Sequence, residues 1–294
     1  MNKKVSPAPG KLMLLGEHAV VYGYPCLVTA VNKGISVTIK KTDNREIQLN
    51  SPLAPKSVYV AAAVSEFSRK YKIKSGLLIT VTSDLHPLWG LGSSSAVTVA
   101  TIKALASVFA IKLTLPQLFD LSLSVVRSIH PKSSGFDIAV AVYGGTIYYQ
   151  IGKPPLKLPP IKLPLLVVYS GNKADTSLQV SAVAALKAKN PTKANNIFHS
   201  ISDLVIKAKD AYLESDWPFL GDLFNRNHQH LIELGVSTEK LNSLAKIALD
   251  NGAFGAKLSG AGGGDCLIVL YPQNKKQAII DAMIDNSFQI LDVL

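Results

Sequence analysis

The sequence has little of several features that define specialised classes of protein. Its 294 residues include only two cysteines, Cys26 and Cys266, which lack the number and spacing of a disulfide framework or a cysteine metal site. No run of about 18 uncharged apolar residues occurs, so no membrane-spanning helix is expected. Charged residues make up only 17% against 48% hydrophobic residues, which is typical of a compact globular chain.

Targeting and polyanion-binding signals are also missing. No apolar segment with a small-residue cleavage site follows the N-terminal residues MNKKVSPAPG, so we predict no signal peptide and a cytoplasmic location. The formal net charge is +11, yet no block of about five or six basic residues occurs, and basic residues do not alternate with aromatic ones. These features predict that neither nucleic acid nor membrane is a partner, and they favour small anionic substrates.

Strand and helix signals follow each other along the whole chain, which predicts an α+β protein. Short runs of β-branched and aliphatic residues predict strands at 11–16, 35–40, 77–83, 165–170, 254–258 and 266–271. Helical segments and their start signals predict helices at 96–111, 116–129, 176–190, 192–213, 217–233 and 237–250. Residues 138–150 read as a short helix or strand, a Gly-Gly break and a strand, and a final helix and strand close the chain.

A proline-rich stretch divides the chain. Residues 153–164, KPPLKLPPIKLP, hold five prolines, which remove the backbone donors that a sheet needs. We therefore interpret this stretch as an extended connector. It predicts two domains, at residues 1–158 and 159–294.

The first glycine-rich loop is PLWGLGSSSA at residues 87–96, between a predicted strand and a predicted helix. Its glycines allow backbone N–H groups to approach a ligand, and a helix N-terminus carries partial positive charge. Serine hydroxyls can bind phosphate oxygens or a magnesium ion. The loop has neither the Walker nor the dinucleotide-binding spacing, so phosphate binding and ordinary helix capping are equally good interpretations of this segment alone.

The second loop, AKLSGAGGGDC at residues 256–266, has glycine at four of the five positions 260–264. Each glycine costs conformational entropy on folding, and a flexible linker is a poor explanation between two predicted strands. This loop therefore predicts a close approach of the backbone to a ligand. Two such loops in a basic chain indicate a nucleotide.

These loops, together with PAPGKLMLLGEHAVV, resemble the three motifs of the GHMP family of small-molecule kinases, at residues 8–25, 87–96 and 255–266. The family phosphorylates galactose, homoserine, mevalonate and phosphomevalonate. The resemblance implies a two-domain α+β fold, with a ribosomal-protein S5-like N-terminal domain and an α/β C-terminal domain. It also implies an active site in the cleft between the domains.

Two branches of the family share segments with this chain. GEHAVVYGYP and the region from 234 to 264 are similar to mevalonate kinases, which implies ATP-dependent phosphorylation of the 5-hydroxyl of mevalonate with Mg²⁺ as cofactor. GGGDC, SSGFDIAVAVYGG and SGNKADTS are similar to phosphomevalonate kinases, so that activity stays an alternative. A non-catalytic nucleotide sensor on the same fold is a third hypothesis, and a homodimer is left open.

The resemblance assigns roles to individual residues. Asp137 corresponds to the aspartate at the reacting hydroxyl, and Lys11 to the lysine beside the transferred phosphoryl group. An aspartate can accept the hydroxyl proton, while a neighbouring lysine keeps that carboxylate ionised and stabilises the phosphate. The implied substrate-binding residues are Glu17, His18, His130 and Ser134. The implied ATP-binding residues are Gly90, Leu91, Gly92, Ser93, Ser94, Ser95, Gly260, Gly262 and Gly263, and Ser94 is also the implied magnesium ligand.

The chain departs from the mevalonate kinase pattern at the metal. The magnesium-binding glutamate of that family corresponds to Val126 here. Magnesium would then be held by Ser94, ATP and water, or by a substitute carboxylate. Asp265 is the candidate substitute, because mevalonate kinases usually have glycine there. His228 and His230 are predicted to lie on a solvated helix face and not to bind metal.

Overall fold

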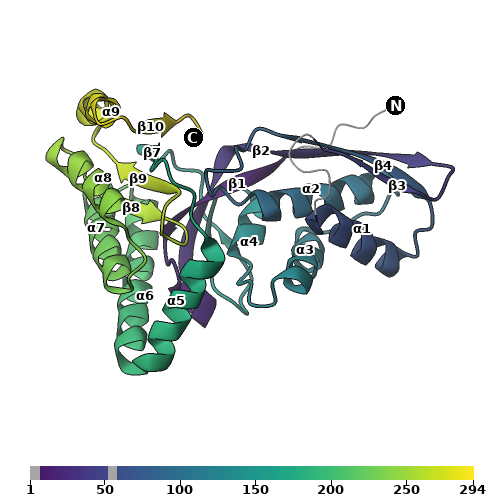
Figure 1. Ribbon diagram of the computed structural model, residues 1–294, viewed down its shortest axis with the longest axis horizontal. Helices are drawn as coiled ribbons and strands as arrows, with labels where there is room; N and C mark the ends of the chain where they lie inside the picture. The colour runs from purple at the N-terminus through teal and green to yellow at the C-terminus, as the bar shows by residue number, and fades with distance from the viewer. Residues whose placement is uncertain (1–6, 52–57) are drawn as a thin grey trace. The chain divides into compact units, whose positions relative to one another are not determined.

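The computed structural model describes residues 7–51 and 58–294 and forms two compact units (Figure 1). The first unit comprises the described parts of 1–11, 30–87 and 91–144, and the second comprises 12–29, 88–90 and 145–294. Neither unit is continuous in sequence, because β1 (Ala8–Leu15) and β2 (Cys26–Thr42) each run from one unit into the other. The boundary at residue 158 stays a prediction.

A six-stranded sheet is organised around the long strand β2. The strand order is β3-β4-β2-β5-β6, and β1 also pairs with β2. β2 pairs antiparallel with β4 through residues 35–42 and with β5 through residues 26–29. The remaining strands are β3 (Ile47–Asn50), β4 (Gly76–Ser83), β5 (Thr146–Tyr149) and β6 (Leu156–Lys157).

The described helices of the first unit lie on one face of the β2, β3 and β4 strands (Figure 1). The most deeply buried is α2, in which alanine, valine and threonine allow close packing on several sides. A capping box between Thr114 and Gln117 begins the third helix, as its Pro116 also favours. The helices are α1 (Val58–Tyr71), α2 (Ser93–Val108), α3 (Leu115–Ile129) and α4 (Phe136–Tyr143).

The second unit contains an antiparallel sheet of order β10-β7-β9-β8. α7 packs closely on β8, since a Cβ added to Gly221 would lie only 2.5 Å from the Phe254 carbonyl carbon. The strands are β7 (Leu165–Tyr169), β8 (Gly255–Ser259), β9 (Cys266–Leu270) and β10 (Gln289–Leu291). The helices are α5 (Thr176–Lys189), α6 (Pro191–Glu214), α7 (Trp217–Glu233), α8 (Glu239–Asp250) and α9 (Lys276–Asp285), besides the short 3-10 helices η1 (Ala19–Tyr22) and η2 (Gln273–Lys275).

The predicted α+β organisation is confirmed, with differences in detail. The sequence analysis did not predict α1 or β3. The connector at 153–164 is mostly extended, but Leu156 and Lys157 pair with β5 as β6. These two residues lie between proline pairs and retain the N–H groups that prolines lack.

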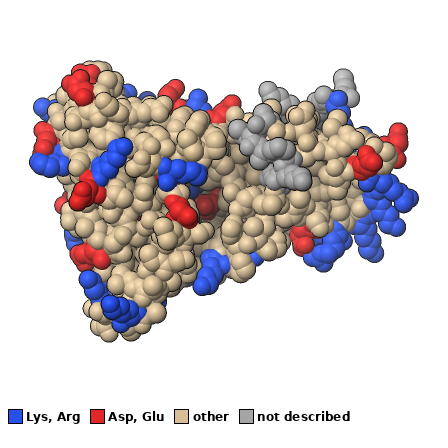
Figure 2. Space-filling model, in the orientation of Figure 1, with Lys and Arg blue, Asp and Glu red and all other residues tan. Residues whose placement is uncertain are grey.

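Positive charge is distributed unevenly between the two units. The first unit holds about half of the Lys and Arg residues but under a third of the Asp and Glu residues. Figure 2 shows Lys and Arg gathered at the end of this unit that carries α1 and β4, where Lys40, Lys41, Lys70 and Lys72 are exposed. No helix in the described part of the chain is both long and apolar enough to cross a membrane.

Candidate functional site

Strand β1 places Lys11 against the first glycine-rich loop. The Lys11 backbone N–H donates to the Leu91 carbonyl oxygen at 2.9 Å, and both residues are buried. Gly92 adopts φ +78°, and a Cβ added there would lie 2.9 Å from Lys11 Cγ. Glycine is therefore required at position 92 both for the left-handed turn and for the lysine stem that crosses it.

The N-terminus of α2 has the properties of an anion site. Gly92 is its N-cap residue and supplies no side-chain cap to the first turn. Ser94 is exposed, whereas Ser95 is buried at the start of the helix. Backbone N–H groups and the partial positive charge of the helix end can therefore interact with a phosphate, next to the Ser94 hydroxyl.

Asp137 lies in the first turn of α4, after the left-handed Gly135. Its Oδ1 atom is buried and has no hydrogen-bond partner among the described residues. Burial raises the pKa of this carboxyl group, and the nearby positive charge of Lys11 partly opposes that rise. Lys11 Nζ in turn lies 5.8 Å from the Phe136 ring centroid. Lys11 and Asp137 thus form one electrostatic unit whose carboxylate can accept a hydroxyl proton.

The segment before α4 carries the other predicted residues of the first unit. His130 is the C-cap residue of α3, and its Nε2 lies 2.8 Å from the Tyr59 hydroxyl. Ser134 is buried. Val126, at the position where the family has a magnesium-binding glutamate, is buried within α3. This helix therefore supplies no carboxylate at that position.

Glu17 lies in the second unit, where its carboxylate is almost fully buried in a polar cluster. It forms an ion pair with Lys257 of β8, and its Oε2 accepts a hydrogen bond from Asn227 Nδ2 at 2.9 Å. Lys257 also donates to the Leu258 carbonyl oxygen at 2.5 Å. Burial raises the pKa of Glu17, and Lys257 opposes that rise.

Lys257 and Asn227 are residues that the sequence analysis missed. A lysine inside the otherwise apolar strand GAKLS was the available signal, because a buried charge requires a partner of opposite sign. The structure identifies that partner as Glu17.

His18 connects the turn after β1 to the second glycine-rich loop, within the second unit. Its backbone has φ +59°, an uncommon conformation for a residue with a side chain. Its Nε2 lies 2.9 Å from the Ala261 carbonyl oxygen. Burial lowers the pKa of His18, so a neutral ring donates this hydrogen bond at neutral pH. Nearby, the Ser259 hydroxyl accepts from the Met13 N–H and donates to the Met13 carbonyl oxygen, each at 3.0 Å.

The second glycine-rich loop has left-handed backbone at Gly260, Gly262 and Gly263. A Cβ added to Gly262 would lie 2.9 Å from the Val236 carbonyl carbon, and one added to Gly263 would lie 2.9 Å from Gln179 Cδ. The positive φ angles therefore favour glycine at all three positions, and packing against the Val236 backbone also requires it at Gly262. The role of this loop in binding ATP stays a prediction.

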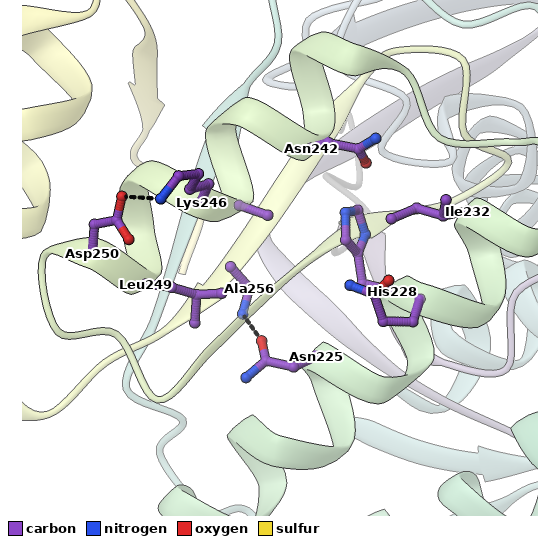
Figure 3. A pocket seen from close by; sticks show the side chains of 10 residues that line it. Asn225, His228, Ile232, Asn242, Lys246, Leu249, Asp250 and Ala256 are labelled. Atoms are coloured by element: carbon purple, nitrogen blue, oxygen red, sulfur yellow. Dashed lines mark hydrogen bonds and ion pairs between the residues drawn. The ribbon is translucent and has the colours of Figure 1, made fainter.

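A separate cavity of about 340 Å³ opens between α7, α8 and β8 (Figure 3). None of the predicted site residues lines it, although His228 does. The predicted solvated position of His228 is wrong, because its ring is buried and its Nδ1 lies 3.4 Å from the Leu258 N–H nitrogen. Burial and Lys257 lower the pKa of His228 to about 4. The described residues contain no cluster of three His, Cys, Asp or Glu side chains that could hold a metal ion.

Comparison with known families agrees with this arrangement. Residues 58–145 match the GHMP kinases N terminal domain, and residues 208–289 match the GHMP kinases C terminal domain. The chain therefore belongs to the GHMP kinase family.

Its similar relatives include mevalonate kinases. The mevalonate kinase of Thermococcus sibiricus is 32% identical over 93% of this chain and 90% of the relative. That of Thermococcus gammatolerans is 34% identical over the same shares. Among solved structures, Methanococcus jannaschii mevalonate kinase has a TM-score of 0.84 and 28% identity, and covers 99% of this chain and 97% of that one.

A ligand-bound structure is also similar. The structure of L. major mevalonate kinase in complex with R-mevalonate has a TM-score of 0.81 and 26% identity, and covers 97% of this chain and 94% of that one. A Streptococcus pneumoniae phosphomevalonate kinase is 18% identical with a TM-score of 0.84, which shows a shared fold alone.

Proposed function

We propose that this kinase transfers the γ-phosphoryl group of ATP to the 5-hydroxyl of mevalonate. The observation that carries the proposal is the buried Oδ1 of Asp137, which has no hydrogen-bond partner among the described residues and lies in the field of Lys11. An alcohol substrate can donate its hydroxyl hydrogen to this atom. The mevalonate kinase relatives favour mevalonate as that alcohol.

In the proposed reaction, the hydroxyl oxygen forms a bond to the γ-phosphorus while the bond from that phosphorus to the β,γ-bridging oxygen breaks. Asp137 accepts the hydroxyl proton, and ADP leaves. The Lys11 ammonium stabilises the negative charge of the transferring group. The N–H groups at the start of α2 bind phosphate oxygens, which the partial positive charge of the helix end favours.

Magnesium fits this site as a cation bound mainly by the nucleotide. The exposed Ser94 hydroxyl at the start of α2 can supply one oxygen ligand, and Val126 supplies none. Mg²⁺ in proteins usually keeps several waters and takes phosphate oxygens of the substrate, so one protein hydroxyl is a sufficient contribution. When bound with ATP, the ion would offset charge on the phosphates.

The proposed mevalonate-binding residues are Glu17 and His18 of the second unit and His130 and Ser134 of the first unit. Lys257 and Asn227 already bind the Glu17 carboxylate. This favours an indirect contribution of Glu17 to mevalonate binding, through the neighbouring His18. The two glycine-rich loops, at 87–96 and 256–266, are the proposed ATP-binding segments.

The proposal also includes a cytoplasmic location. Its support is the use of ATP as a co-substrate and the presence of only two cysteines in the sequence, both buried, which suits a reducing compartment. Light scattering after size exclusion would measure whether the protein is a monomer or a homodimer.

Steady-state kinetics with three acceptors test the proposed function. The purified chain is given ATP and magnesium with mevalonate, mevalonate 5-phosphate or galactose, and ADP formation and the phosphorylated product are both measured. We expect kcat/KM to be highest for mevalonate. A preference of about tenfold or more for the 5-phosphate, roughly 1.4 kcal/mol in transition-state binding, would instead support phosphomevalonate kinase.

A further inference from the structure

Asp265 ends the second glycine-rich loop in a conformation that suits glycine. Its φ is +56°, in the left-handed region, which is less favourable for a residue with a side chain than for glycine. Its side chain is nevertheless buried. A residue kept under this strain needs a compensating interaction, and the carboxylate supplies one.

The Asp265 carboxylate and backbone bind the turn that follows β7. Oδ1 accepts a hydrogen bond from the Ala174 N–H at 3.0 Å. The Asp265 N–H donates to the Asn172 carbonyl oxygen, and the Ser170 N–H donates to the Asp265 carbonyl oxygen, each at 2.8 Å. Three hydrogen bonds therefore fix this residue on the 170–174 turn.

The other side of the same carboxylate lies against the first glycine-rich loop, within the second unit. A Cβ added to Gly90 would lie 2.5 Å from Asp265 Cγ and 2.9 Å from its Cβ. The adjacent Cys266 thiol donates to the Trp89 carbonyl oxygen at 3.2 Å. The two loops that we assign to the nucleotide are thus held together at Asp265 and Gly90.

We propose that Asp265 is a positioning residue that holds Trp89 and Gly90 in place and thereby sets the affinity for ATP. In this proposal it acts through the loop and not as a magnesium ligand, since its carboxylate accepts the Ala174 N–H and packs on Gly90. The inference rests on the proposed function in one respect, namely that the loop at 87–96 binds ATP.

The first variant, Asp265→Gly, removes the carboxylate and also relieves the left-handed strain. A loss of nucleotide binding therefore does not come from new backbone strain at position 265. We expect binding of AMPPNP with magnesium, measured by calorimetry without mevalonate, to weaken about tenfold, as expected for a lost hydrogen bond to a charged group. The KM for mevalonate should change less than about twofold.

Asp216→Asn is the matched control. Asp216 is an exposed N-cap carboxylate that accepts one backbone N–H, from Phe219, at the same 3.0 Å as the bond from Ala174 to Asp265. This variant should lose no more stability than Asp265→Gly does, because asparagine can also cap a helix. Its AMPPNP affinity should equal that of the wild type.

A second pair of variants tests the contact from the opposite side. Gly90→Ala places a methyl group against the Asp265 carboxylate and should weaken AMPPNP binding more than Asp265→Gly does. The double variant Gly90→Ala with Asp265→Gly removes the obstructing carboxylate. It should bind AMPPNP more tightly than Gly90→Ala alone, although the left-handed alanine prevents full recovery.

Two results would overturn the proposal. One is unchanged AMPPNP affinity in Asp265→Gly together with no rescue of Gly90→Ala. The other is a raised magnesium requirement in Asp265→Gly at unchanged nucleotide affinity, which would make Asp265 a metal ligand. Because calorimetry needs no acceptor, failure of wild-type protein to phosphorylate mevalonate would refute the proposed function while leaving this test intact.

Discussion

Removing the cation of the buried ion pair, by Lys257→Met, should strongly destabilise the protein. Lys257 has no exposed side-chain surface and Glu17 has 1%, so the variant leaves a carboxylate buried without its counter-charge. Breaking a buried pair in this way typically costs about 3–5 kcal/mol. Asn227 still donates one hydrogen bond to Glu17, so we expect the lower half of that range.

The destabilisation should depend on pH in a defined direction. Burial already raises the pKa of Glu17 above its ordinary 4.5, and loss of Lys257 removes the main opposing influence. The folded-state pKa of the variant is then further above that of the unfolded chain. The variant therefore loses stability as pH rises from the unfolded-state pKa of Glu17 to its folded-state pKa. It regains stability as pH falls, because the buried carboxyl group then becomes neutral.

Urea denaturation at pH 7 and pH 5 measures both effects, and a double-mutant cycle isolates the pair. Glu17→Gln with Lys257→Met removes both charges and keeps an oxygen for Asn227, so it should cost less than the two single variants added together. Lys246→Met is the control, since Lys246 and Asp250 form an exposed pair at 2.7 Å that is worth about 1 kcal/mol or less. Additivity within about 0.5 kcal/mol, or a Lys257→Met loss no larger than that of the control, would refute the reasoning.

Further predictions concern the reaction. Asp137→Asn and Lys11→Met should each lower kcat by about two or more orders of magnitude; near-normal kcat in Asp137→Asn would contradict the assignment. Asp137→Asn should also unfold at an equal or higher temperature in calorimetry, because an ionised carboxylate with a raised pKa opposes folding at neutral pH. His18→Ala should raise the KM for mevalonate about tenfold through loss of the bond to Ala261; an unchanged KM counts against it. Ser94→Ala should raise the magnesium concentration for half-maximal rate more than the KM for mevalonate, and the reverse order would exclude Ser94 as a ligand.

Much of the fold follows from local sequence patterns. The β-branched run at 165–170 and the capped segment after Ser237 predicted β7 and α8 to within a few residues. α1 was missed, although Val60, Val64 and Phe67 are buried along one of its faces. Short strands such as β3 depend on a neighbouring strand, and that information is not local.

Some features of the candidate site depend on residues that are neighbours in sequence, and others depend on contacts between residues far apart in sequence. The glycine-rich loop before α2 is a local feature that the sequence predicted, although α2 begins at Ser93 and not at the predicted residue 96. The partner of Glu17 is 240 positions away in sequence, so no local pattern could identify Lys257 as that partner. The same holds for Asp265, whose contact with Gly90 exists only after folding. Long-range pairing of buried polar groups is therefore the part that a single sequence does not reveal.

The ion pair with Lys257 weakens the electrostatic effect that Glu17 has on a charged substrate. A free Glu17 carboxylate would repel the phosphate of mevalonate 5-phosphate, which favours the uncharged mevalonate hydroxyl. In the structure Lys257 offsets that charge, and burial raises the pKa of Glu17 as well, so repulsion by Glu17 is weak. The proposed preference for mevalonate over its 5-phosphate then depends on how many Lys and Arg side chains can pair with the extra negative charges of the 5-phosphate. Lys257 contacts both the Glu17 carboxylate and the Leu258 carbonyl oxygen, so the ion pair connects the turn after β1 to the start of the second glycine-rich loop.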